Sequence, residues 1–174
     1  MYLELPTDRV YVKIPRGRLD TPLRPIRQHT DLAEEEFVLD EIQQLVEKAG
    51  SEVVILVDAN TIRHDVTEEV WNLIQRTGFP VYSAPMGKTA VPEDYERYGG
   101  VGYLCLFSLR LGAHAVQQIY VGSISHPEIK EKVESAKLVL SIGGLKSDFN
   151  TGNFTYRTSR ASTVEVTWIF VIAC

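Results

Sequence analysis

The apolar residues of this chain fall into two patterns, short unbroken runs and longer stretches with helical spacing. The runs at 53–57 (VVILV) and 138–142 (LVLSI) are almost entirely apolar, which is typical of strands buried on both faces of a parallel sheet. The stretch 31–49 has helical spacing, and Gly50 follows it at the position where helices commonly stop. Its predicted inward face consists of Val38, Ile42, Leu45, Val46 and Ala49.

Four further segments extend this alternation. They are a helix over 66–77 that ends at Gly78, a strand over 80–84, a helix over 127–136 and a short strand over 163–166. The first of these helices is expected to turn Val70, Leu73 and Ile74 inward. Ser125 and Glu128 have the spacing of a capping box at the start of the second. Strands that alternate with helices predict an α/β fold, a Rossmann-like parallel sheet with flanking helices.

The pattern before the first helix is different. A short strand is expected over 2–5, because Pro6 lacks the amide hydrogen that would continue it. Residues 7–28 contain three prolines and few periodic apolar positions. This segment is therefore predicted to be an extended linker.

Composition narrows the class of protein. The chain has 174 residues, of which 44% are hydrophobic and 24% charged, and this suits about one globular domain. Its net charge of -5 provides no basic surface for nucleic acid or an anionic membrane, and no apolar run reaches the ~20 residues of a membrane helix. Cys105 and Cys174 lie far apart without the spacing of a metal site, so a reducing cytoplasm suits the chain best.

Two groups of polar residues could carry chemistry or regulation. Arg63, His64 and Asp65 precede the second helix, where they form either a proton-exchanging, regulatory group or, as is more common, an ion pair with a helix cap. Asp148 and Asn150 follow the strand at 138–142. They either contact a ligand or partner, or hydrogen-bond their own loop as Asx-turns. Both interpretations stay open at this point.

The remaining motifs provide no catalytic site. The glycines at 143–144 are not part of a dinucleotide fingerprint, and the GKT at 87–89 lacks the upstream glycine of a phosphate-binding loop. The carboxylates at the start of the first helix complement the helix dipole, with a cation site as the less common alternative. The sequence shows no nucleophile–histidine arrangement, paired carboxylates or metal-ligand spacing.

Six short segments, taken in their order and spacing, resemble the fungal pyruvate decarboxylases. They are YLELPTD at 2–8, VDA at 57–59, RHDV at 63–66, PMGK at 85–88, YGG at 98–100 and SDFNTG at 147–152. The resemblance covers most of residues 2–101 and 120–166. It implies the central one of three α/β domains, with residues 1–30 as the end of the pyrimidine-binding domain plus a linker.

The same resemblance implies an activity, which is the conversion of pyruvate to acetaldehyde and carbon dioxide with thiamine diphosphate and Mg2+. In the family, the catalytic and magnesium-binding motifs belong to the other two domains. No catalytic, cofactor-binding or metal residue is therefore expected in this chain, and neither cofactor is expected to bind to it alone. The expected partners are other domains or subunits of the same decarboxylase, which is a homo-oligomer in the family.

The chain also departs from the family's pattern. Some relatives carry a regulatory cysteine where this chain has Asn60 and Thr61, although His64 stands nearby. Relatives run from Gly-Gly-Val directly into Tyr-Val-Gly-Ser, whereas here 18 residues, 102–119, interrupt the central domain predicted over 31–166. Residues 167–174 form an aberrant tail, which would leave the sheet incomplete. We interpret both segments as intron sequence translated in frame, and their apolar side chains predict marginal solubility.

These observations favour a central-domain piece of a pyruvate decarboxylase that is inactive alone. Two alternatives belong to other classes: a stand-alone nucleotide- or dinucleotide-binding module, and a structural interaction domain. The loop at 148–152 is expected to face another domain rather than a substrate of its own.

Overall fold

The computed structural model describes residues 6–20, 31–99, 119–167 and 171–173. The chain divides into two compact units, Met1–Asp31 and Leu32–Cys174. The predicted strand at 2–5, most of the insertion predicted at 102–119 and part of the predicted tail lie outside the described residues. The domain identities predicted for these parts stay predictions.

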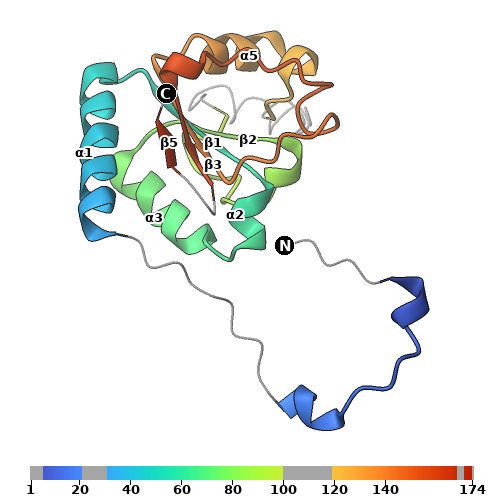
Figure 1. Cartoon of the computed structure of the whole chain (residues 1–174). Helices are drawn as coiled ribbons and strands as arrows, with labels where there is room; N and C mark the ends of the chain where they lie inside the picture. The colour runs from blue at the N-terminus through green and yellow to red at the C-terminus, as the bar shows by residue number, and fades with distance from the viewer. Residues whose placement is uncertain (1–5, 21–30, 100–118, 168–170, 174) are drawn as a thin grey trace. The chain divides into compact units, whose positions relative to one another are not determined.

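The larger unit is built on a sheet of five strands in the order β2-β1-β3-β4-β5 (Figure 1). Four of the strands run parallel, and β5 pairs antiparallel with β4. Their bounds are β1 Val53–Val57, β2 Val81–Ser83, β3 Leu138–Ile142, β4 Thr163–Val166 and β5 Val171–Ala173. The predicted α/β parallel sheet is confirmed, and the antiparallel β5 comes from the segment that was predicted to be an aberrant tail.

Helices cover both faces of this sheet, as Figure 1 shows for α1 and α3 on one side and α5 on the other. Their bounds are α1 Leu32–Ala49, α2 Ala59–Arg63, α3 Thr67–Thr77 and α5 Pro127–Glu134. Two hydrophobic layers result, because successive strand side chains point to opposite faces. The α1/α3 layer includes Val53, Ile55 and Ile74, whereas the α5 layer includes Tyr82 and Tyr120.

The apolar runs predicted as buried strands are confirmed. All five residues of β1 are buried, and four of the five in β3 are buried, with the hydroxyl-bearing Ser141 half-buried. Gly50 and Gly78 have φ angles of 60° and 65°, and the amide of Gly78 donates to the Ile74 carbonyl oxygen. Both predicted glycine stops therefore end their helices in the left-handed conformation that glycine tolerates best.

Several local predictions are wrong. Ser125 does not cap α5, because its Oγ accepts from the Val121 amide and the N-cap residue is His126 without a side-chain bond. Leu73 is 39% exposed, since it lies at the edge of the α3 face that Val70 and Ile74 bury.

Two more differences concern short helices that the sequence pattern did not reveal. α2 forms directly after β1, because Asp58 accepts from the Ala59 amide as its N-cap. The predicted linker contains two short 3-10 helices, Thr7–Arg9 and Arg16–Asp20. Among the described residues, none of the helices has both the length and the apolar character needed to cross a bilayer.

Candidate functional site

The strand order creates one place in the sheet where a ligand would be expected. β1 is followed in the chain by β2 on one side, while β3 lies on its other side, so the direction of winding reverses between β1 and β3. In open α/β sheets, ligands bind at the carboxyl ends of the strands at such a reversal. The loops that leave β1, β2 and β3 meet there.

Asp58 and Asn150 occupy this position. Asp58 follows β1 and is 5% exposed, and Asn150 lies in the loop after β3 and is fully buried. The Asn150 Nδ2 donates to Asp58 Oδ2 at 2.7 Å and to the Leu145 carbonyl oxygen at 2.8 Å. Asn150 Oδ1 accepts from the Met86 amide at 2.9 Å. We call this arrangement the Asp58–Asn150 clasp, since it joins the loops after β1, β2 and β3.

The carboxylate of Asp58 accepts three hydrogen bonds within the protein. Its Oδ1 accepts from the Ala59 amide at 2.7 Å, and its Oδ2 accepts from the Leu145 amide at 2.7 Å as well as from Asn150. Three N–H donors replace the water that a buried carboxylate loses, so the charge is stabilised without a cation. A bound anion would meet this negative charge instead of free amides.

Two glycines bring the backbone of neighbouring loops into direct contact. A Cβ on Gly143 would lie 2.4 Å from the Thr61 amide nitrogen, and a Cβ on Gly87 would lie 2.4 Å from the Val57 carbonyl oxygen. Gly143 has a φ angle of 72°. In dinucleotide-binding folds, glycines at this edge make room for a pyrophosphate, whereas here they make room for the protein's own backbone.

The space that remains at the clasp is small. A cavity of about 20 Å³ is lined by Asp58, Gly144, Leu145 and Tyr156 among others, which is room for about one water molecule. A second cavity of about 250 Å³ lies over β4 and includes Thr158 in its lining. This volume is below the roughly 300–1,000 Å³ of typical small-molecule sites.

A tyrosine pair supports the clasp from the α5 layer. The rings of Tyr120 and Tyr156 have centroids 4.5 Å apart, and the Tyr156 hydroxyl lies 3.1 Å from the Tyr120 carbonyl oxygen and 3.3 Å from that of Asn150. Burial above all, and then the electrostatic influence of Asp58 and of the neighbouring Tyr120 hydroxyl, raise the pKa of Tyr156. This hydroxyl therefore stays protonated and acts as a hydrogen-bond donor.

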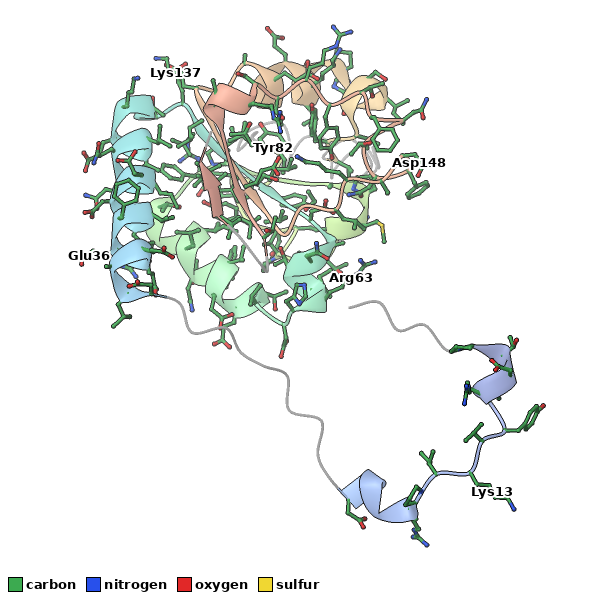
Figure 2. The ribbon with its side chains drawn as sticks, in the orientation of Figure 1. Lys13, Glu36, Arg63, Tyr82, Lys137 and Asp148 are labelled. Atoms are coloured by element: carbon green, nitrogen blue, oxygen red, sulfur yellow. The ribbon has the colours of Figure 1, made fainter. Side chains whose placement is uncertain are left out.

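The structure separates the site residues predicted from the sequence. Arg63 ends α2 and Asp148 lies in the loop after β3, and Figure 2 shows both side chains at separate places on the surface. His64 is the half-buried C-cap of α2, and its amide donates to the Asn60 carbonyl oxygen at 3.0 Å. The exposed Asp65 has a φ angle of 54°.

The structure gives Asp148 and Asn150 different hydrogen-bond partners within the chain. Asp148 hydrogen-bonds its own loop, through the Phe149 amide at 2.7 Å, whereas Asn150 reaches the loops that follow two other strands. Sequence reasoning missed the role of Asp58 in this site. The available signal was an aspartate directly after a buried strand, at the edge where parallel strands end.

The described residues contain no group of three or more histidine, cysteine, aspartate or glutamate side chains that could hold a metal ion. This includes the acidic N-terminal turn of α1, where Glu34 and Glu35 are exposed. The dipole of α1 is the physical reason for carboxylates at that end.

Comparison with known proteins adds the family. Residues 39–119 match the family model described as thiamine pyrophosphate enzyme, central domain. The chain is 42% identical to a pyruvate decarboxylase of Candida albicans and 41% identical to one of Aspergillus terreus, each over 165 residues. It is also 42% identical over 165 residues to pyruvate decarboxylase isozyme 1 of Saccharomyces cerevisiae. These alignments cover 95% of this chain and 26% of each relative, so the chain spans about a quarter of their length. With its α/β sheet and these matches, the chain is similar to the central domain of the thiamine pyrophosphate enzymes.

Proposed function

We propose that this chain serves as the central domain of a pyruvate decarboxylase, whose intact polypeptide converts pyruvate to acetaldehyde and carbon dioxide. The observation that supports this assignment is the closed carboxyl edge of the sheet, where the Asp58–Asn150 clasp occupies the position of a ligand. A domain of this kind contributes packing surfaces and not catalytic groups. Chemistry in the intact enzyme belongs to thiamine diphosphate and Mg2+ held elsewhere.

The Asp58–Asn150 clasp does not fit either cofactor. A diphosphate needs free amides or cations, whereas the amides of Ala59 and Leu145 at the strand ends already donate to the Asp58 carboxylate. Mg2+ is bound by several oxygen ligands, whereas the clasp contributes a single carboxylate, Asp58, which already accepts three protein hydrogen bonds. We therefore assign no catalytic, cofactor-binding or metal-binding residue to this chain.

A stand-alone nucleotide-binding module is not favoured, for the same geometric reason. Such a module would need open backbone at Gly87 and Gly143, and both glycines contact the backbone after β1.

An activity assay tests the first part of the proposal. The purified 174-residue chain is incubated with pyruvate, thiamine diphosphate and Mg2+, and acetaldehyde is measured, with the S. cerevisiae isozyme 1 as a positive control. We expect no acetaldehyde above the protein-free blank. Turnover comparable to the control would contradict the assignment of a packing domain.

Calorimetric titration tests the closed edge directly. Thiamine diphosphate with Mg2+ and, separately, an adenine dinucleotide are titrated into the chain, and we expect no binding heat in either case. Micromolar binding of the dinucleotide would instead support the nucleotide-binding alternative.

We also propose which surface packs against other domains or subunits of the decarboxylase. Phe149 is 74% exposed, Phe154 65% and Ile124 72%. Gly152 lies between the two phenylalanines in sequence. Ile124 packs beside this glycine, since a Cβ on Gly152 would come within 2.9 Å of Ile124 Cγ1. Large apolar side chains that gather on a rigid surface are typical of an interface.

The loop that carries these side chains is held firmly. The Thr151 hydroxyl donates to the Ser147 carbonyl oxygen at 2.7 Å and accepts from the Phe154 amide at 2.9 Å. Phe154 has a φ angle of 60°, which is unfavourable for a bulky residue and persists only where surrounding contacts impose it. The exposed residues Arg63, Asp65 and Asp148, with the half-buried His64, are further candidates for interface or regulatory contacts, whereas the buried Asn150 supports the loop from below.

Co-purification tests this surface. The tagged chain is co-expressed with an intact fungal pyruvate decarboxylase, and we expect association that the double variant F149S/F154S reduces at least tenfold. L39S is the matched control, because Leu39 is 58% exposed on α1, far from this loop in sequence. Equal loss in both variants, or none in the double variant, would argue against this surface.

We further propose a cytoplasmic location, on the basis of the cysteine content. Cys105 and Cys174 are the two cysteines of the chain and show no disulfide framework in sequence. A fluorescent fusion that enters the secretory pathway would contradict this.

A further inference from the structure

The outer edge of β2 is occupied by two pieces of chain that are far apart in sequence. Val81 forms a parallel bridge with Tyr98, and Ser83 forms a parallel bridge with Ile119. The Val81 amide donates to the Arg97 carbonyl oxygen at 3.0 Å, and the Gly99 amide donates to the Val81 carbonyl oxygen at 2.6 Å. On the second piece, the Tyr120 amide donates to the Ser83 carbonyl oxygen at 2.9 Å. Both pieces follow the hydrogen-bond pattern of a parallel strand.

The spacing of the two bridges is that of a single strand. Their partners in β2, Val81 and Ser83, are two residues apart, so an unbroken strand would place the second bridge two residues after Tyr98. Ile119 stands at this position although it follows Tyr98 by 21 residues. Nineteen residues, 100–118, are therefore in excess of what the strand requires.

The side chains also alternate across the gap as they would in one strand. Tyr98 belongs to the α1/α3 layer, and its hydroxyl donates to Ser83 Oγ at 2.9 Å. Tyr120 belongs to the α5 layer, where it is fully buried against Tyr156. If Gly99 is followed directly by Ile119 and Tyr120, positions 98 and 120 fall on opposite faces, as the period of two demands.

We propose that 98–99 and 119–120 are the two halves of one interrupted sixth strand, and that residues 100–118 are an insertion which the sheet does not require. Gly99 has a φ angle of 71°, outside the β region, which marks where the chain departs from the strand. This inference rests on the register of the described flanks and is independent of the proposed function. The segment suggested by family resemblance, 102–119, is shorter by one residue, and a glycine bulge at this position would absorb that difference.

Deletion of residues 100–118 from the full chain tests the proposal. We expect the variant to unfold cooperatively with a midpoint roughly 5 °C above that of the parent, because closing a 19-residue loop no longer opposes folding. Hydrogen exchange measured by mass spectrometry is expected to show protected amides at Gly99 and Tyr120 in both proteins. Loss of that protection, together with a lower midpoint, would overturn the proposal.

A deletion that is longer by one residue serves as the matched control. Removal of 100–119 would shift Tyr120 to the position of Ile119 and turn its ring toward the wrong face. We expect its midpoint to fall at least 5 °C below that of the 100–118 deletion. Removal of 102–119 keeps a two-glycine bulge and is expected to fold. If neither this variant nor the 100–118 deletion shows protected amides at the junction, the interrupted strand does not exist.

Discussion

The two hydrophobic layers that cover the sheet differ in the kind of side chain that they bury. The α1/α3 layer is filled mainly by aliphatic side chains, and Tyr98 is its one buried aromatic residue among those described. The smaller α5 layer places Tyr82 and Tyr120 at its core, with Tyr156 packed against it. The first layer depends on shape and apolar area, and the second also depends on the partners of its hydroxyl groups.

This difference follows the position of the candidate site. The hydroxyl of Tyr120 donates to Glu134 Oε1 at 3.1 Å and accepts from the Arg157 amide at 3.4 Å, and Tyr156 reaches the carbonyl oxygen of Asn150. The α5 layer thus continues into the polar clasp at the carboxyl edge. A closed ligand position can thus be part of the core, because the groups that fill it are themselves buried and hydrogen-bonded.

The largest loss of stability is expected from a cavity in the α1/α3 layer. Ile74 is fully buried in α3, so Ile74→Ala should lower the free energy of unfolding by about 2–5 kcal/mol through lost apolar contact and a residual cavity. Urea denaturation followed by circular dichroism measures this change. Leu73→Ala, at the neighbouring 39% exposed position, is the control and should cost clearly less.

Breaking the clasp should cost somewhat less. Asn150→Ala removes the donor to Asp58 and the acceptor of the Met86 amide, and we expect a loss of about 2–4 kcal/mol because a carboxylate and an amide lose partners while buried. The same denaturation experiment applies. Asp148→Ala, at an exposed position of the same loop, should change stability by less than about 1 kcal/mol. Equal losses of stability in the two variants would show that the clasp contributes no more to stability than an exposed contact.

Alkaline pH should lower the free energy of unfolding through the buried tyrosines of the α5 layer. Burial raises the pKa of Tyr82 to about 12, whereas the unfolded tyrosine titrates near 10. The stability linked to this shift is complete below pH 10 and is lost as pH rises toward 12, because the unfolded state releases the proton first. From pH 9 to pH 11 we expect Tyr82 to account for a loss of about 1 kcal/mol.

Tyr82→Phe isolates this contribution. Denaturation of the parent and the variant at pH 9 and pH 11 should show a smaller loss in the variant. Burial also raises the pKa of Tyr98 and Tyr120, so part of the alkaline loss should persist. An unchanged pH dependence would mean that Tyr82 ionises in the folded state as easily as in the unfolded one.

The smallest effect is expected from an ion pair outside both layers. Lys137 Nζ lies 2.5 Å from Glu52 Oε1, and the two side chains are 59% and 53% exposed. Lys137→Gln should therefore change the free energy of unfolding by less than about 0.5 kcal/mol, since water screens both charges. A loss comparable to that of Asn150→Ala would contradict the distinction between buried and exposed polar contacts.

Local pattern was sufficient to predict most of the fold. The unbroken apolar runs at β1 and β3, the helical spacing of α1 and α3 and the glycines after them each depend on neighbours within a few residues. These signals determine which segments are strands and helices and which faces turn inward. The capping box at Ser125 failed because its hydroxyl accepts from the Val121 amide instead, and the capping-box rule does not include that competition.

The amino-acid sequence by itself determined an α/β chain of alternating buried strands and amphipathic helices. Six of its short segments also indicated the family resemblance. Only the tertiary structure decided what Asn150 does, because its partners after β1 and β2 lie 64 to 92 residues away in sequence. The same is true of the edge of β2, where Tyr98 and Ile119 meet one strand in a shared register. Such pairings depend on how the strands are ordered in space, and hydrophobic periodicity carries no information about that order.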